Sequence, residues 1–290
     1  MKALGLIPRR VKRENGRHAL VDGIPFALPV RSLRMQALMA AFPIDTDQAR
    51  ALLPPSVSPV RLWRRSLLVI TVVNYQETVI GKYIEFSVAL ACARRHSDPP
   101  RLLPLVLPGR FHFGQYVVDL PVSTEISVKG GKGIWGMPKH QANLDFFVTD
   151  TAASSQYDKD GQFAMSVEIR RGGLRLPARM GASNYCQFRG MLMKSDVYFR
   201  GRAEVGFGRK ASASLEIGDH PRLEAVKRLD IVKRPVFTVF FPDAHGVLDD
   251  YMESWFLPFE QPPQGPLEGL ESVIDLGLGE EWLPPPARRT

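Results

Sequence analysis

The sequence of residues 129–145, KGGKGIWGMPKHQANLD, decides between two fold classes. It contains a G-x-G-x-x-G motif that begins at Gly131 and has the spacing of a dinucleotide-binding fingerprint. That fingerprint works only where a helix begins at the glycines and faces a pyrophosphate within a βαβ unit. Pro138 follows the last glycine by two residues, and residues 144–148 have the composition of a strand. The stretch therefore favours a β-rich protein over a nucleotide-binding α/β protein.

The segments around this stretch also indicate a mostly β protein. Residues 67–74 and 83–92 have the composition of buried strands. Further strands are expected at residues 115–119, 122–129, 143–149, 163–170, 187–193, 197–205, 211–217 and 236–241. Short helices are expected at residues 46–53, capped by Asp45, and at residues 222–229. Because strands and helices do not alternate, we predict a mostly β (α+β) fold with a few short flanking helices.

Length and composition predict one main domain with two terminal extensions. The chain has 290 residues, of which 44% are hydrophobic, so it can bury a sizeable core. Lysine and arginine dominate residues 1–23, which we expect to form a basic N-terminal arm. Residues 24–257 are expected to fold as the domain. Residues 258–290 are rich in proline, glycine and acidic residues, and we expect a loosely attached tail.

The charge of the chain narrows the choice of partners. Lysine and arginine number 38 against 30 acidic residues, a net charge of +8 that suits an anionic partner. No aromatic residues interleave the basic arm and no recognition motif appears, so we expect no nucleic acid. No apolar run approaches the roughly 18 residues of a membrane span, so we expect no membrane association. The start of the chain lacks the pattern of a secretory signal, and the cytoplasm is the expected compartment.

Metal ligands and cofactor motifs are sparse. The chain has two cysteines and six histidines, and no two histidines lie three to five residues apart. Such spacings are typical of zinc sites. We therefore expect no bound metal.

Lys139 stands next to a bulky apolar cluster and a rigid proline. A lysine that forms a Schiff base must be a neutral amine, but only about one free lysine in 2,500 is neutral at pH 7. Burial in apolar surroundings or a nearby cation favours the neutral form. Trp135 and Met137 are the candidates for an apolar wall around this side chain.

Two motifs resemble those of a known family. Residues 131–139 resemble the active-site segment of the acetoacetate decarboxylase family, which ends in a proline followed by two lysines. Residues 81–85, GKYIE, resemble the family's Gly-x-Tyr-x-Glu segment. The likeness covers roughly residues 24–257. It implies a closed, cone-like β-barrel, a homo-oligomer and chemistry without a cofactor.

The resemblance also assigns roles to individual residues. It implies that Lys139 forms a Schiff base with a small β-keto (oxo) acid, as in the enzyme that names the family. Glu85 would face the lysine and either move protons or orient the substrate carbonyl. Arg34, or Arg31 if the spacing differs, would meet the substrate carboxylate at the mouth of the pocket. The implied activity is that of a carbon–carbon lyase, a decarboxylase.

Two departures from the family pattern leave the reaction open. His140 stands where the family has its second lysine, and Ile70 stands where it has another catalytic glutamate, fifteen residues before Glu85. Glu77 and Glu125 are the nearest acids that could replace that glutamate. Residues 139 and 140 are successive, so on an extended segment their side chains point to opposite faces.

Three functions therefore remain open. The first is decarboxylation of a β-keto acid. The second is Schiff-base aldol or dehydration chemistry on another oxo acid, and the third is ligand binding without turnover. Borohydride trapping with pyruvate or a larger keto acid separates the second from the third, and product formation from acetoacetate identifies the first.

Overall fold

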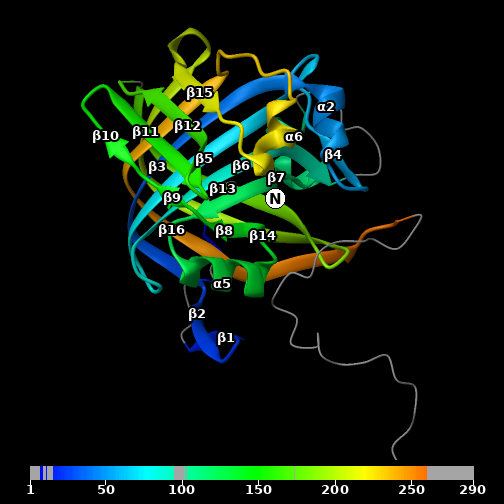
Figure 1. Ribbon diagram of the computed structural model, residues 1–290, viewed down its shortest axis with the longest axis vertical. Coiled ribbons are helices and arrows are strands. Elements are labelled where there is room, and N and C mark those ends of the chain that lie inside the picture. The colour runs from blue at the N-terminus through cyan, green and yellow to red at the C-terminus, as the bar shows by residue number, and fades with distance from the viewer. Residues whose placement is uncertain are drawn as a thin grey trace, which may run out of the picture.

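A closed seven-strand β-barrel forms the body of the protein (Figure 1). The computed structural model describes residues 7–8, 11, 16–94, 101, 103–172 and 174–259. In order around the barrel, the strands are β6 (Tyr83–Arg94), β5 (Arg65–Thr78), β3 (Val30–Asp45), β16 (Phe237–Phe256), β14 (Met191–Phe207), β13 (Leu174–Phe188) and β7 (Phe113–Val122). β7 pairs with β6 and closes the barrel. The predicted mostly β fold and its closed sheet are confirmed.

Smaller elements extend and cover the barrel. β4 (Val57–Pro59) pairs with β6, and β8 (Lys139–Gln141) runs parallel to β7. A second sheet contains β9 (Asn143–Leu144), β10 (Phe147–Val148), β11 (Ala152–Lys159), β12 (Gln162–Arg170) and β15 (Ala213–Ile217). The short helices are α2 (Thr46–Ala51), α3 (Leu103–Val106), α4 (Pro108–Phe111), α5 (Glu125–Trp135) and α6 (Glu224–Lys227), with 3₁₀ turns at Gly208–Lys210 and Pro221–Leu223. No helix in the described part of the chain is long and apolar enough to cross a membrane.

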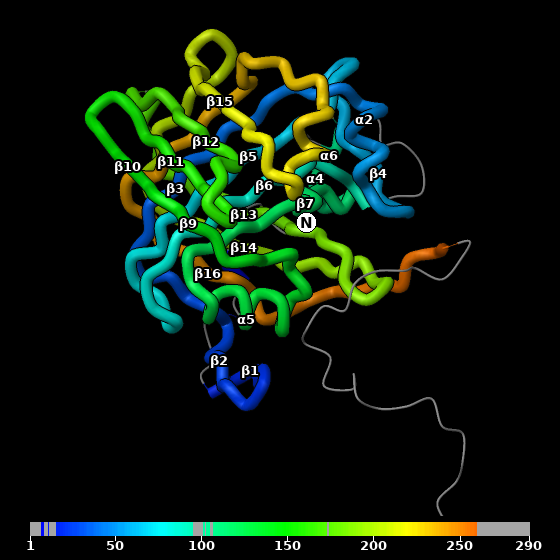
Figure 2. The backbone as a smooth tube through the Cα atoms, in the orientation of Figure 1, coloured from blue at the N-terminus to red at the C-terminus, as the bar shows by residue number. Residues whose placement is uncertain are grey.

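A two-stranded hairpin of β1 (Arg17–Val21) and β2 (Ile24–Leu28) lies next to α5, as the tube in Figure 2 shows. The expected boundary between the basic arm and the domain, at residues 23 and 24, falls at the turn of this hairpin. Most of the arm before Gly16 and the tail from residue 260 onward lie outside the described residues.

Alternation along the barrel strands separates two cores. On β5, Ile70 and Val72 point out of the barrel into a large cluster shared with the second sheet and α6. Val73 points inward, where it packs with Met35 and Phe241 from β3 and β16. Because successive side chains of a strand face opposite sides, each barrel strand contributes to both layers.

The N-terminus of α2 follows the sequence prediction. The Asp45 carboxylate accepts hydrogen bonds from the backbone N–H groups of Asp47 at 3.0 Å and Gln48 at 2.9 Å. These bonds satisfy donors that have no partner within the helix. The predicted cap is confirmed.

The predicted strand at residues 122–129 is wrong, because β7 ends at Val122 and α5 begins at Glu125. Glycine-rich sequence has low helix propensity, but the glycines here permit close packing. A Cβ atom at Gly130 would lie 2.8 Å from the Phe26 ring of the hairpin. A Cβ atom at Gly133 would lie 2.4 Å from a Val21 methyl. The close packing of these glycines against the hairpin therefore outweighs their low helix propensity.

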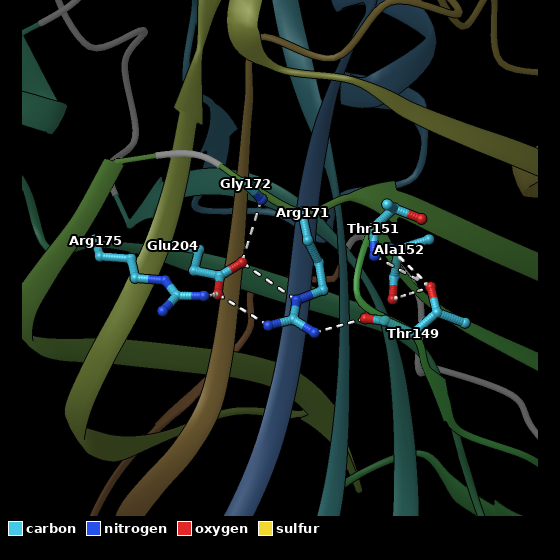
Figure 3. Close-up of polar contacts among 7 residues, drawn as sticks. All are labelled: Thr149, Thr151, Ala152, Arg171, Gly172, Arg175 and Glu204. Atoms are coloured by element: carbon cyan, nitrogen blue, oxygen red, sulfur yellow. Dashed lines mark hydrogen bonds and ion pairs between the residues drawn. The ribbon is translucent and has the colours of Figure 1, made fainter.

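A buried carboxylate links the second sheet to the barrel (Figure 3). Glu204 on β14 accepts hydrogen bonds from Arg171 Nε at 3.2 Å and Arg171 Nη2 at 3.0 Å, and Arg175 Nη2 lies 3.0 Å from the same carboxylate. Arg171 also donates to the Thr149 carbonyl at 2.6 Å, just before β11. The Arg171 hydrogen bonds outweigh burial and hold the pKa of Glu204 below its ordinary value.

Glu204→Gln should lower the free energy of unfolding by about 1.5–3 kcal/mol near neutral pH, because a buried charged hydrogen-bond partner is lost. Because the pKa of Glu204 is lower in the folded than in the unfolded protein, its carboxylate stabilises the fold at pH values above the unfolded pKa of about 4.3. This contribution is lost as the pH falls through the folded-state pKa. The difference between wild type and variant should therefore shrink below pH ~4. Urea denaturation across pH 3–8 measures it, with exposed Glu168→Gln as control. A difference that stays constant down to pH 3 would contradict the assignment.

Candidate active site

A cavity of about 90 Å³ lies inside the barrel. Its walls come from barrel strands, from Gly131 and Trp135 of α5, and from Met137 and Lys139, which follow that helix. Among the described residues that line it, Lys139 is the only basic residue and Glu85 the only acidic one. The remaining lining residues are aliphatic, aromatic or neutral and polar, and they include Trp135 and Met137. A single charged pair thus faces a mainly uncharged cavity.

Lys139 and Glu85 meet in this cavity. Lys139 is the first residue of β8 and lies opposite Leu120 of β7, while Glu85 lies on β6. Lys139 Nζ is 2.6 Å from Glu85 Oε2 and donates to Ser127 Oγ at 3.0 Å. The side chains are 9% and 18% exposed, respectively. The structure therefore brings together two residues that are separated by more than fifty positions, in the apolar surroundings that the sequence predicts.

Two tyrosines stand beside this pair. The rings of Tyr75 and Tyr83 stack with their centroids 4.5 Å apart, and Lys139 Nζ is 5.5 Å from the centre of the Tyr83 ring. Burial, together with the Glu85 carboxylate, raises the pKa of both tyrosines well above the ordinary value. Both hydroxyls therefore stay protonated and can donate hydrogen bonds near the lysine.

Helix α5 leaves room for the lysine side chain at Gly131. A Cβ atom at this position would lie 2.3 Å from Lys139 Cδ. The end of the helix is fixed in place, since Trp135 Nε1 donates to the Asp249 carbonyl at 3.3 Å and Cys186 Sγ donates to the Gly136 carbonyl at 3.3 Å. Burial raises the pKa of the Cys186 thiol to about 12, which keeps it a protonated donor.

The glycine motif of this segment belongs to a helix end. Gly131 lies in the second half of α5, and Gly136 adopts a left-handed conformation, with φ of 65°, at its C-cap. Phosphate groups bind at helix N-termini, where N–H groups are unpaired, and not at C-termini. The expectation that the motif binds no dinucleotide agrees with this geometry.

His140 points away from Lys139, on the opposite face of β8. Its Nε2 lies 2.9 Å from Asp119 Oδ1, and the same carboxylate accepts from the Tyr157 hydroxyl at 2.8 Å and from Arg222 Nε at 3.3 Å. Although burial opposes it, these partners hold the pKa of Asp119 below its ordinary value. His140 therefore belongs to a structural network between the barrel and the second sheet, and it adds no cation beside the lysine.

The position fifteen residues before Glu85 does not face the cavity. Ile70 is fully buried in the outer core between the barrel and the second sheet. The neighbouring residues on the cavity side of β5 are Thr71, Val73 and Tyr75, and none of them is an acid. Counting along the sequence alone could not find Thr71, because a shift of one residue exchanges the two faces of a strand.

The other candidates lie outside the cavity lining. Arg34 is exposed and pairs across strands with exposed Glu77, and Glu125 is exposed at the start of α5. Arg31 donates from Nη2 to the Val11 carbonyl at 2.7 Å. None of these four side chains lines the cavity. The structure therefore brings neither Arg34 nor Arg31 to the Lys139–Glu85 pair.

A match to a protein-family model identifies the family of the chain. The model described as Acetoacetate decarboxylase (ADC) matches residues 12–189, more than half of the chain. The chain belongs to the acetoacetate decarboxylase family. No curated protein sequence matches it significantly.

Solved structures share the acetoacetate decarboxylase fold at low identity. One acetoacetate decarboxylase is 16% identical with a TM-score of 0.60, over 79% of this chain and 90% of that chain. The acetoacetate decarboxylase of Legionella pneumophila subsp. pneumophila str. Philadelphia 1 is 15% identical with a TM-score of 0.60, over 88% and 98%. The enduracididine biosynthesis enzyme MppR, complexed with the condensation product of pyruvate and imidazole 4-carboxaldehyde, is 14% identical with a TM-score of 0.56, over 78% and 88%.

Gly131→Ala should lower borohydride trapping of an oxo acid by about 100-fold, because the added methyl displaces the Lys139 side chain and a displacement of about 1 Å costs this much. Intact mass spectrometry after reduction with pyruvate measures the trapped fraction. Gly130→Ala is the matched control, since its methyl meets Phe26 of the hairpin and not the lysine. Trapping by Gly131→Ala at the wild-type level would show that the lysine tolerates the methyl.

Proposed function

We propose that the protein is a Schiff-base lyase that acts on a small oxo acid, with Lys139 as the nucleophile. The observation that supports this is the 2.6 Å contact between Lys139 Nζ and Glu85 Oε2 in a cavity with no other charged lining residue among those described. Family membership gives independent support, because related structures are acetoacetate decarboxylases or hold pyruvate adducts.

In the proposed mechanism, Glu85 moves the protons. It accepts a proton from Lys139, whose neutral amine attacks the substrate carbonyl carbon and forms a carbinolamine. Glu85 then returns the proton to the hydroxyl, which leaves as water and gives the iminium. Ser127 positions the lysine nitrogen through its hydrogen bond, and the Tyr83 ring attracts this nitrogen while it is charged.

The iminium makes the loss of carbon dioxide feasible. When the bond between the α-carbon and the carboxylate breaks, its electron pair moves into the iminium and leaves an enamine, so no bare carbanion forms. Protonation of the enamine carbon and addition of water then release the ketone and the free lysine. We favour decarboxylation of a β-keto acid, because the leaving group is neutral and the cavity walls are mainly apolar.

A second reaction is also supported by a specific observation. Glu85 is the only acid among the described residues that line the cavity, and MppR, which shares the fold, is seen with a pyruvate condensation product. The same lysine could therefore carry aldol or dehydration chemistry on another oxo acid. A third possibility, a family member that binds a ligand without turnover, predicts that borohydride traps no adduct with pyruvate.

Lys139→Ala should abolish borohydride trapping with pyruvate, because no other lysine is among the described residues that line the cavity. Glu85→Gln should slow trapping by about 100-fold, since proton transfer contributes at least that much. Intact mass and circular dichroism measure the adduct and the fold. Lys129→Ala, on α5 and outside the cavity lining, is the control. An adduct on Lys139→Ala would disprove the assignment.

Carbon dioxide release from acetoacetate distinguishes the two reactions. Wild-type protein that traps pyruvate and also releases carbon dioxide from acetoacetate is a decarboxylase. Trapping of pyruvate without such release supports the aldol or dehydration reading, and no trapping with any oxo acid supports ligand binding alone.

We also propose that the protein is a homo-oligomer, as the resemblance implies. Of the apolar segment at residues 255–257, Phe256 is 85% exposed while Leu257 is buried. An exposed aromatic side chain of this kind is common at interfaces between subunits. Light scattering at micromolar concentration should give a mass above the 32.5 kDa of one chain. A monomer would contradict the proposal.

A further inference from the structure

Thr71, one of the residues that line the cavity, has a buried hydroxyl without a hydrogen-bond partner among the described residues. Thr71 is 8% exposed, lines the cavity from β5, and has an Oγ1 atom closed to solvent. A buried hydroxyl without a partner destabilises the fold, and valine has the same shape without that cost. Folding alone therefore does not account for threonine at this position.

The wall around Thr71 is polar but uncharged. Ser87 of β6 lies directly opposite Thr71 in the strand register, is also 8% exposed and lines the same cavity. Elsewhere on the lining, Gln115 Nε2 donates to Asn184 Oδ1 at 2.7 Å. That bond uses one donor and one acceptor, and each amide has further hydrogen-bonding capacity.

The strand register places this wall relative to the reactive pair. Val73 lies opposite Glu85, and Thr71 lies opposite Ser87, two residues further along both strands. Two residues of a strand span about 7 Å. A ligand that contacts both the reactive pair and Thr71 must therefore reach from the carbonyl carbon that Lys139 attacks to an atom several bonds away.

The charges of the cavity limit what this ligand atom can be. Lys139 and Glu85, the only charged lining residues among those described, pair with each other. A carboxylate or an ammonium group near Thr71 would lie buried without a counter-ion, which is strongly unfavourable. The group that fits is neutral and forms hydrogen bonds, as a hydroxyl or carbonyl oxygen does.

We propose that Thr71, with Ser87 beside it, selects substrates that carry a neutral hydroxyl or carbonyl oxygen on about the third carbon beyond the carbonyl that Lys139 attacks. The inference rests on the proposed function, because the reacting carbonyl fixes the other end of the substrate. It names the substrate class as oxo acids with a distal neutral oxygen.

The test compares two acids that differ by one hydroxyl, 2-oxopentanoate and 5-hydroxy-2-oxopentanoate. The measurement is the concentration that gives half-maximal borohydride trapping at Lys139. Wild type should need about 3–10-fold less of the hydroxylated acid, the effect of one neutral hydrogen bond. Thr71→Val should bring the two concentrations together, and Thr71→Ser should keep most of the preference.

Ser195→Ala is the matched control. Ser195 Oγ on β14 is also buried without a hydrogen-bond partner among the described residues, but Ser195 does not line the cavity. This variant should keep the full preference. Loss of the preference in Ser195→Ala would show that it does not depend on a group in the cavity, and would overturn the assignment.

The other outcomes separate this inference from the proposed function. Equal trapping of the two acids by wild type, or an unchanged preference in Thr71→Val, overturns the inference and leaves the role of Lys139 intact. Failure of wild type to trap any oxo acid overturns the proposed function, and the inference with it. The melting temperature of Thr71→Val should equal or exceed that of wild type. A decrease of more than about 5 °C would show that the hydroxyl serves the fold, and would overturn the inference.

Discussion

The antiparallel pairing of β6 with β7 closes the barrel, and the candidate site depends on that closure. β7 carries β8 on its other side in parallel, so Lys139 lies opposite Leu120 while Glu85 lies opposite Val122. Lys139 and Glu85 reach each other across β7 because β7 pairs with β6 on one side and with β8 on the other. An open sheet would leave them on separate edges, without the walls that exclude water from their contact.

Alternation along β8 divides two neighbouring residues between different tasks. Lys139 faces the cavity and His140 faces Asp119, Tyr157 and Arg222 on the outer side. The outer network holds β8 against β7 and the second sheet. The position of Lys139 therefore does not depend on a second lysine next to it. A motif with two adjacent basic residues can therefore lose the second one and keep the geometry of the first.

Local composition predicted the features that depend on few residues. The capped helix after Asp45 and the buried strand β5 followed from local propensity. The contact between Lys139 and Glu85 was implied by the resemblance of two motifs to those of the acetoacetate decarboxylase family. Helix α5 was missed because its glycines matter only through contacts with Lys139 and the hairpin, which are distant in sequence. Thr71 was missed because a count of fifteen residues landed on the wrong face, at Ile70. Arg34 was nominated from spacing in a segment where strand irregularities shift the register, and it lies on the surface.

The close approach of Gly131 to the lysine makes these two positions a sterically coupled pair. A side chain at residue 131 and a lysine in this rotamer at residue 139 compete for the same volume, since the Cβ and Cδ positions are 2.3 Å apart. Within this fold, a chain that has replaced the lysine by a shorter residue is free to replace the glycine as well. Joint inspection of the two positions in related sequences therefore gives a marker for members that have abandoned covalent chemistry.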